Sequence, residues 1–287
     1  MAIKVVTDST SYISEELKRR YDISVASLSV IFENEEFKEI HIENESFYEK
    51  LDRSLCIPTS SQPSIDEMYK ILEKHVRDNN EVIGVFLSSD MSGTYSNACL
   101  AKSMIIENYP NALIEIIDSR SNCMQLGFAV LTAAIAAQEG RVIEEVVSLV
   151  KDNIKRSRFM FIPDTLEYLK KGGRIGGASA LLGTIFQIKP ILTVVNGKTE
   201  LFGKVRTKKR AIQTMIDKFI EDITKHGLGE VTIHHINDVE GALAFAKIIE
   251  ECIGKKVDIA PIGPVIGTHV GPGALGIVYY TESNLSN

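Results

Sequence analysis

Hydroxyl-bearing side chains are concentrated in short polar stretches, three of which directly follow apolar runs. These stretches are TDSTS at residues 7–11, SSDMSGTYSNA at 88–98, DSRS at 118–121 and TSSQPS at 59–64. Taken singly, each could do no more than cap a helix, with Ser92 or Thr94 satisfying free backbone amides. Taken together, they predict a shared polar pocket, in which hydroxyls and helix N-terminal amides favour an anion such as a carboxylate or a phosphate.

Two stretches in the second half combine cations with glycine or with one another. Residues 170–177 (KKGGRIGG) match neither the dinucleotide-binding nor the phosphate-loop motif. The apolar residues 178–188 that follow predict a buried helix or, alternatively, the wall of an apolar cavity. Residues 204–210 (KVRTKKR) carry five cations in an acidic chain. They form either a solvated helix start or a site for a phosphate or an acidic partner surface.

One histidine, His269, lies among four glycines and two prolines in residues 263–274. These rigid surroundings would present its imidazole to a cleft, and a purely structural role is the alternative. His234 and His235 lie in a strand pattern and point to opposite faces, which argues against a metal-binding pair. We find no cluster of His, Cys, Asp and Glu at metal-ligand spacing, so no metal site is expected.

Alternating strands and helices position the hydroxyl-rich turns in the first half. Buried parallel strands are predicted at residues 3–6, 82–87 and 113–117, and helices at 14–21, 64–78, 94–108, 122–139 and 143–155. In a wound α/β sheet, ligands bind beyond the carboxyl ends of the strands, where these turns lie. A hairpin is predicted between residues 24–32 and 36–40, as an insertion at the sheet edge.

The pattern changes near residue 156. Strands are predicted at residues 158–162, 190–195, 199–204, 231–236, 257–260 and 276–280, and helices at 207–225 and 239–253. The Asn196–Gly197 step indicates a hairpin and therefore antiparallel pairing. We predict an α/β domain with a wound, mostly parallel sheet at residues 1–155, and an α+β domain with a largely antiparallel sheet at 156–287.

Composition narrows the class of protein. The chain has 287 residues, of which 44% are hydrophobic and 24% charged. This composition excludes a disordered or fibrous protein. The net charge of −6 argues against non-specific nucleic-acid binding. Its four cysteines are widely spaced, the N-terminus lacks the features of a signal peptide, and no apolar stretch is long enough to span a membrane. We expect a cytoplasmic protein.

The motifs occur in an order that resembles a known family. The series TDSTS, TSSQPS, SSDMSGTY, IDSRS, KKGGRIGG, KVRTKKRA and GTHVGPGALG is similar to the DegV family, and in particular to the fatty-acid-binding subunits of bacterial fatty acid kinase. The resemblance implies a two-domain protein that buries a long-chain fatty acid between its domains. It also implies a carrier that is not itself catalytic and needs no cofactor, and that presents the acid to a separate ATP-dependent kinase subunit for phosphorylation to an acyl-phosphate.

The resemblance also assigns roles to individual residues. It implies that Ser60, Ser92 and His269, with Ser61 and Gly93 beside them, bind the carboxylate of the fatty acid. The family commonly has threonine where this chain has Ser60, but the hydroxyl is kept. Residues that would line the tail tunnel are Ile175, Leu182, Ile185 and Phe186, and those that would face the kinase and the phosphate are Arg174 and Arg206.

An enzyme is the competing interpretation. A serine esterase would use Ser92 as nucleophile and His269 as base. However, the Asp-Met-Ser-Gly-Thr segment around Ser92 is not a GxSxG motif, and no orienting carboxylate is evident beside His269. The expected partners are therefore a long-chain fatty acid and the kinase subunit, with no nucleic acid, and transient membrane contact is left open.

Overall fold

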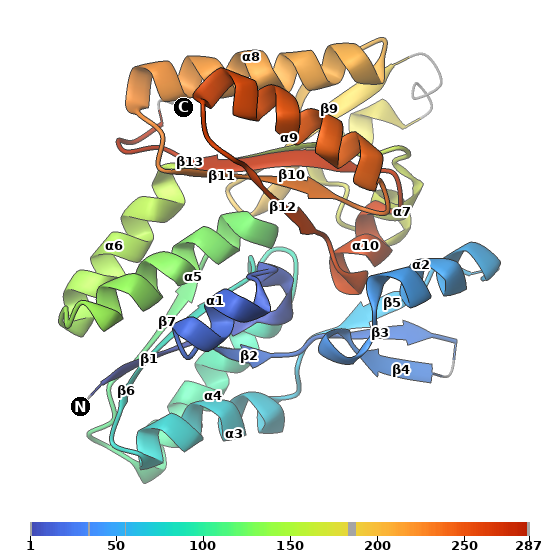
Figure 1. The fold of residues 1–287 in the computed structure, drawn as a ribbon. Helices are drawn as coiled ribbons and strands as arrows, with labels where there is room; N and C mark the ends of the chain where they lie inside the picture. The colour runs from blue at the N-terminus through green and yellow to red at the C-terminus, as the bar shows by residue number, and fades with distance from the viewer. Residues whose placement is uncertain (1, 34, 55, 183–187, 286–287) are drawn as a thin grey trace.

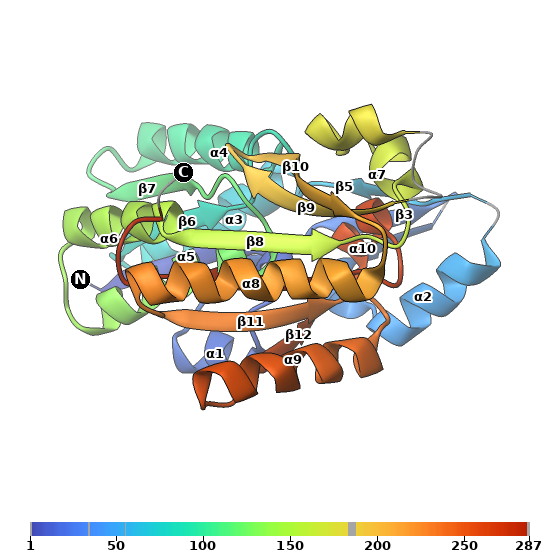
Figure 2. The ribbon, with the colours of Figure 1, turned by 90° about the horizontal axis from the view of Figure 1, so that it is seen from above.

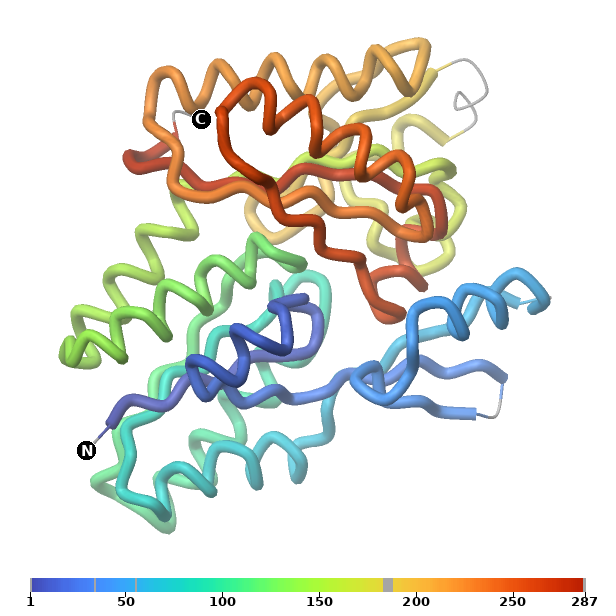
Figure 3. Tube along the Cα trace, in the orientation of Figure 1, coloured from blue at the N-terminus to red at the C-terminus, as the bar shows by residue number. Residues whose placement is uncertain are grey.

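A computed structural model describes residues 2–33, 35–54, 56–182 and 188–285 of the chain. The first half of the chain forms the lower part of the molecule in Figure 1, and the second half forms the upper part. Figure 3 shows one exception, because the red segment that contains residues 264–270 reaches down to the blue N-terminal segment.

The N-terminal half is built on a parallel sheet with the strand order β2-β1-β6-β7. Its strands are β1 Ile3–Asp8, β2 Ser24–Ala26, β6 Glu81–Phe86 and β7 Ile114–Asp118. The helices of this half are α1 Glu15–Arg20, α3 Ile65–Arg77, α4 Thr94–Asn108, α5 Cys123–Gln138 and α6 Ile143–Lys155. Helices α3 and α4 pack on one face and α5 on the other, so the strands are apolar on both sides.

A small antiparallel sheet projects from this half. It consists of β3 Ser29–Phe32, β4 Glu35–Lys38 and β5 Thr59–Ser61 in the order β4-β3-β5. The segments η2 Glu39–His41 and α2 Asn44–Arg53 connect β4 to β5. The predicted hairpin exists between β3 and β4. The prediction of one strand over residues 24–32 is wrong, because β2 pairs with β1 in the parallel sheet and the chain then leaves it for β3.

The C-terminal half is built on a six-stranded sheet with the order β10-β9-β8-β13-β11-β12. Its strands are β8 Ser157–Ile162, β9 Lys189–Val195, β10 Lys198–Val205, β11 Glu230–His235, β12 Asp258–Pro261 and β13 Leu275–Tyr280. All neighbours are antiparallel except β11 and β12. Helices α8 Lys208–His226 and α9 Val239–Ile253 cover its outer face, as seen from above in Figure 2. The predicted fold class is confirmed.

Several short helical segments were not predicted as such. They are η1 Ser9–Ser11, α7 Glu167–Lys171, η3 Gly176–Leu181 and α10 Pro264–Val270, in addition to α2. The buried helix predicted for residues 178–188 is replaced, as far as the structure describes this stretch, by the short 3₁₀ segment η3. Glycines at 172, 173, 176 and 177 explain the difference, because glycine is a poor helix former and two of them have positive φ.

One hydrophobic core joins the two halves. The inner face of the parallel sheet, helix α5 and the inner face of the antiparallel sheet belong to the same buried cluster, which includes Val85, Leu126, Phe159 and Val278. The chain passes from α6 to β8 at residues 155–157, where the domain boundary is predicted. Within the described residues, none of the helices has the length and apolar character that a bilayer crossing requires.

Asp222 of α8 ties the outer helix layer to the antiparallel sheet and gives a test of this packing. Its carboxylate accepts hydrogen bonds from Arg158 Nε at 2.8 Å and Tyr279 Oη at 2.7 Å, and it lies 3.0 Å from Lys218 Nζ. Its side chain is 4% exposed. We expect Asp222→Ala to lower the free energy of unfolding by roughly 2–4 kcal/mol, because a half-buried cation and a buried hydroxyl lose their acceptor.

Urea denaturation followed by circular dichroism measures this loss. The control is Glu221→Ala at the next position, where the carboxylate makes only exposed ion pairs with Lys218 and Lys225. That change should cost less than about 1 kcal/mol. Equal effects of the two substitutions would contradict the structural role of Asp222.

Candidate functional site

A cavity lies between the two halves of the molecule, within the shared core. The space that its lining residues enclose is about 820 Å³, part of which is open to solvent. Most of the lining side chains are apolar and come from both halves. The polar lining residues are Ser60, Gln62, Ser92, Asn122, Arg174, Thr199 and His269.

The structure brings Ser60 and His269 together across the two halves. Ser60 Oγ of β5 lies 2.7 Å from His269 Nε2 of α10. Alternation along the strand explains why Ser60 and Gln62 line the cavity whereas Ser61 does not. Ser61 Oγ is instead 3.4 Å from Glu36 Oε1 on β4. Ser61 therefore does not lie in the head-group site predicted for it.

His269 is held as a neutral imidazole. Burial, with a further contribution from the positive charge of Arg174, lowers its pKa from 6.5 to about 4. Its Nδ1 atom is buried and has no hydrogen-bond partner among the described residues. An unpaired acceptor is less costly to bury than an unpaired N–H, which favours the tautomer with the hydrogen on Nε2. In that state the imidazole donates to Ser60, and the Ser60 hydroxyl hydrogen is free for an anionic ligand.

Ser92 combines the two roles considered for it from the sequence. It lines the cavity, and its Oγ also accepts a hydrogen bond from Thr94 N at 3.3 Å and lies 2.9 Å from Thr94 Oγ1. Gly93 is the residue just before α4, but the space beside it is filled by Gln62, whose Nε2 would lie 2.5 Å from an added Cβ. Gly93 therefore makes room for Gln62, and it is not among the residues that line the cavity.

Arg174 lies at the opening of the cavity. It is exposed and yet contributes to the lining. Its guanidinium donates from Nε to Met91 O at 3.0 Å, across to the other half, and from Nη1 to Gly172 O at 2.6 Å. Gly172 in turn packs closely on the His269 ring. Arg174, Gly172, His269 and Ser60 thus form a continuous series of contacts. Ser92 follows Met91 in the chain and lines the same cavity.

Of the other predicted site residues, those that the structure describes do not line the cavity. Ile175 packs at the edge of the main core, and Leu182 is 40% exposed; neither lines the cavity. Ile185 and Phe186 lie outside the described residues. Arg206 is exposed between β10 and α8 and does not line the cavity.

None of residues 7–11 or 118–121 lines the cavity, so the prediction that all these turns share one pocket is wrong for both stretches. The first turn has a structural role. Asp8 is buried, and its carboxylate accepts from Thr10 N at 3.0 Å, Thr10 Oγ1 at 2.6 Å and Leu87 N at 2.8 Å. Burial raises the pKa of Asp8 to about 6, although these hydrogen bonds oppose the shift. Asp8 thereby fixes the loop that carries Ser92.

The apolar wall of the cavity was missed from the sequence. Phe159 and Phe161 of β8 line it, whereas the alternate residues Met160 and Ile162 pack on the outer helices. Gly276 of β13 lies next to these rings, and an added Cβ would be 2.9 Å from Phe159 Cε2. Two features of the sequence could have predicted this wall: the alternation of side chains along β8, and a glycine inside the apolar strand β13.

Comparison with known proteins places the chain in a family. The family model described as "Uncharacterised protein, DegV family" matches residues 2–282. A DegV domain-containing protein from Clostridium acetobutylicum is 53% identical over 285 residues, covering 99% of this chain and 100% of the relative. Protein DegV from Bacillus subtilis is 37% identical over 287 residues, covering 97% and 99%. The chain belongs to the DegV family.

Solved structures share the whole fold. A DegV family protein from Thermus thermophilus, described for its fatty acid binding, superimposes with a TM-score of 0.90 at 28% identity, covering 98% of this chain and 100% of that one. A stearic acid-binding protein from Eubacterium ventriosum gives 0.89 at 25% identity, with 98% of each chain covered. Bacillus subtilis DegV, described as a fatty acid binding protein, gives 0.87 at 37% identity, covering 98% and 99%.

The protonation of His269 gives a test of the site geometry. In the ligand-free protein, we expect the imidazole protonation shift in an NMR titration to have its midpoint near pH 4, because burial and the Arg174 charge disfavour the imidazolium ion. In Arg174→Gln the midpoint should rise, since the repulsive charge is gone. A protonation midpoint near the ordinary value of 6.5 in the unsubstituted protein would show that His269 is not enclosed in this way.

Proposed function

We propose that this protein binds a long-chain fatty acid in the cavity between its two halves. The carboxylate is held by the hydroxyls of Ser60 and Ser92 with His269 behind Ser60, and the tail lies along the apolar wall that includes Phe159 and Phe161. The hydrogen-bonded Ser60–His269 pair in a mainly apolar cavity carries the proposal. It is supported by the fatty acid binding for which the related structures are described.

The two parts of the ligand contribute differently. Burial of about 15 methylene groups at roughly 0.8 kcal/mol each is favourable by on the order of 12 kcal/mol before ordering costs. Each hydrogen bond to the carboxylate adds only about 1–3 kcal/mol. The tail therefore sets affinity, while the polar region fixes the direction of the ligand and selects a carboxylate. Arg174 supplies a positive charge at the opening.

We propose that the protein acts as a carrier and not as an esterase. The hydroxyl bonded to His269 is Ser60, whereas Ser92 is engaged with Thr94. The buried Nδ1 of His269 has no carboxylate beside it in the described part of the chain, so nothing orients the ring as in a catalytic triad. Those observations favour retention of the acid over hydrolysis of an ester.

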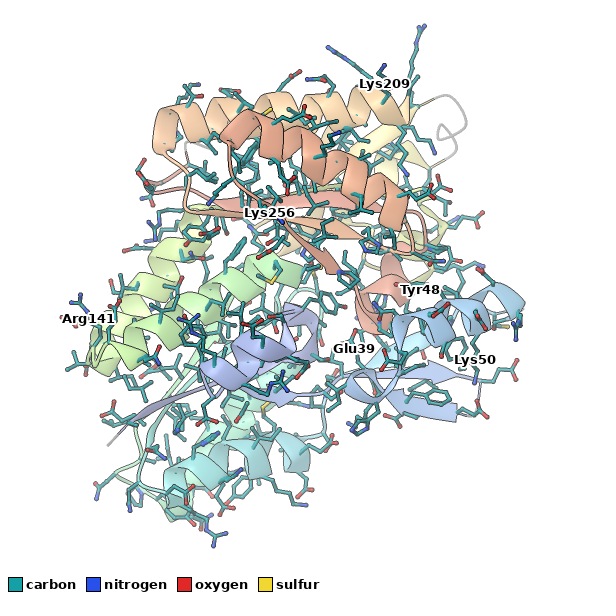
Figure 4. The ribbon with its side chains drawn as sticks, in the orientation of Figure 1. Glu39, Tyr48, Lys50, Arg141, Lys209 and Lys256 are labelled. Atoms are coloured by element: carbon teal, nitrogen blue, oxygen red, sulfur yellow. The ribbon has the colours of Figure 1, made fainter. Side chains whose placement is uncertain are left out.

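We further propose that a separate ATP-dependent kinase phosphorylates the bound acid, in the cytoplasm, at the Arg174 opening. Exposed cations outside the cavity would meet that partner: Arg206, with Lys209 and Arg210 at the start of α8. Figure 4 shows Lys209 extending away from the start of α8 into solvent. A cationic surface of this kind suits an acidic protein face and speeds association.

Lipid analysis of the purified protein tests the binding function. The protein is denatured in organic solvent and the released lipid is identified by mass spectrometry. We expect near-stoichiometric fatty acid in the unsubstituted protein, and substantially less in Ser60→Ala, Ser92→Ala and His269→Ala, since each loses part of the head-group site. Ser61→Ala is the matched control, because its side chain lies off the cavity, and it should retain the wild-type amount.

Circular dichroism should show that the four variants stay folded. If the unsubstituted protein holds no fatty acid even after incubation with added acids, the carrier proposal is wrong. If lipid is present but unaffected in the three variants, the assigned head-group site is wrong and the binding function stands.

Charge reversal at Arg206 tests the kinase surface. We expect Arg206→Glu to slow phosphorylation of the bound acid by the cognate kinase subunit on the order of tenfold, because a surface cation steers association, while the amount of bound lipid is unchanged. Lys256→Glu is the control: Lys256 is exposed between α9 and β12, on another part of the surface (Figure 4). A normal rate of phosphorylation in Arg206→Glu would show that Arg206 does not contribute to kinase docking.

A further inference from the structure

A buried carboxylate, that of Glu39, lies outside the cavity and joins the two halves of the molecule. Glu39 begins the short 3₁₀ segment η2 and is 6% exposed. It accepts hydrogen bonds from Ser9 Oγ, from Tyr12 Oη at 3.0 Å and, across to the other half, from Val265 N at 2.9 Å. Figure 4 shows Glu39 and Tyr48 at the place where the N-terminal elements meet α10.

The bond to Val265 holds the start of α10. The first amides of a helix lack partners within the helix and favour a negative charge, and Val265 is the second residue of α10. Gly263 permits the close approach, since an added Cβ there would lie 2.7 Å from Glu39 Oε1. Nearby, Tyr48 Oη donates to Ile262 O at 3.2 Å. The N-terminal half thus grips the beginning of this helix.

Helix α10 carries the predicted head-group histidine. His269 follows Val265 by four residues, so the two side chains lie on one face of the helix, one turn apart. Val265, Ile266, His269 and Val270 all line the cavity. Any displacement of the helix start therefore changes the distance between His269 and Ser60 and the shape of the apolar wall.

We propose that Glu39 is a positioning residue for ligand binding: its carboxylate anchors α10 to the N-terminal half and so sets His269 against Ser60. Glu39 does not line the cavity, and it acts on the ligand only through α10. The effect on the ligand rests on the fatty-acid-binding function proposed above, whereas the effect on His269 does not.

The surroundings of Glu39 make its ionisation visible near neutral pH. Burial is the largest influence and raises its pKa to about 7; the nearby carboxylate of Asp8 adds to the rise, and the three hydrogen bonds oppose it. The other titratable groups that face it are Tyr12, Tyr48 and Cys123, all uncharged at this pH because burial raises each pKa. His234, whose ring packs on Tyr12, is buried with a pKa of about 4 and is also neutral.

The expected direction follows from these contacts. As pH falls through about 7, Glu39 is protonated and its charge-assisted hydrogen bond to Val265 N weakens. The effect of acidification on the stability of the whole chain has the opposite sign. Because the pKa of Glu39 in the folded protein is above the ordinary 4.5, protonation of Glu39 favours the folded state between pH 7 and 4.5. Loss of ligand on acidification would therefore not reflect unfolding caused by this group.

NMR of the His269 ring is the primary test and needs no substitution. In the unsubstituted, ligand-free protein its Cε1–H signal should show a small change with a midpoint near pH 7, separate from its own protonation near pH 4. The step near pH 7 should be absent in Glu39→Gln, which keeps the shape of the side chain but cannot ionise. In Asp8→Asn the step should remain, with its midpoint at a lower pH, because removal of the Asp8 charge lowers the pKa of Glu39.

Fatty acid dissociation supplies the second readout. The dissociation rate of bound palmitic acid should rise about two- to five-fold when the pH is lowered from 8 to 6. A change of this size is expected when a charge near a helix N-terminus is lost. In Glu39→Gln the rate should be raised at both values and lack this step. Tyr48→Phe is the matched control, because it removes another bond next to α10 without removing a charge, and it should retain the pH step.

A flat His269 signal around pH 7 in the unsubstituted protein, or an unchanged step in Glu39→Gln, would overturn the proposal. If the protein binds no palmitic acid at any pH, the proposed function fails, and the His269 signal still decides the role of Glu39. If Glu39→Gln does not fold, the titration of the unsubstituted protein and of Asp8→Asn decides it.

Discussion

The structure depends on one constraint: the two sheets have apolar inner faces that only the opposite half of the molecule can cover. Helix α5 lies between them and is buried along most of its length, and the side chains on both sides of it form a single cluster. Burial of this shared surface is the main source of stability for both halves. A space for a ligand inside such a core must be created by specific residues, because interiors otherwise pack without large voids.

Small residues and a short helix create that space. Gly276 of β13 leaves room next to the phenylalanine rings of β8, and Ala274, just before β13, and four residues of α10 also line the cavity. The polar groups lie where the loops after the parallel strands meet the second half, as expected for ligand sites of open α/β sheets. Because α10 is fixed by Glu39 from the N-terminal half, the head-group region and the closure of the two halves are coupled.

The sequence predicted the regular elements well, because apolar runs and helical periodicity are local signals. It failed where pairing over long distances decides the outcome. Ser60 was expected in a loop, but pairing with Val30 makes its segment a strand and turns Ser61 away from the cavity. The hydroxyls of residues 7–11 looked like those of residues 88–98, yet the carboxylate of Asp8 turns them inward to support the second loop.

The contact between Ser60 and His269 spans 209 residues, and no spacing rule could reveal it; only the resemblance to the family pointed to it. The apolar wall was assigned to residues 175–186, since a continuous apolar segment is easy to see in a sequence. In the described part of the chain, the wall is assembled from alternate residues of β8 together with side chains of β9, β13, α7 and α10. Glu39 gave no signal at all, because a glutamate in a polar segment is ordinarily exposed.

A crystal structure of the protein with bound palmitic acid would locate the head group and the tail of the ligand. We expect the carboxylate within hydrogen-bond distance of Ser60 Oγ and Ser92 Oγ, with the tail against Phe159 and Phe161. Palmitic acid bound elsewhere, or in this cavity with its carboxylate away from Ser60 and His269, would contradict this expectation.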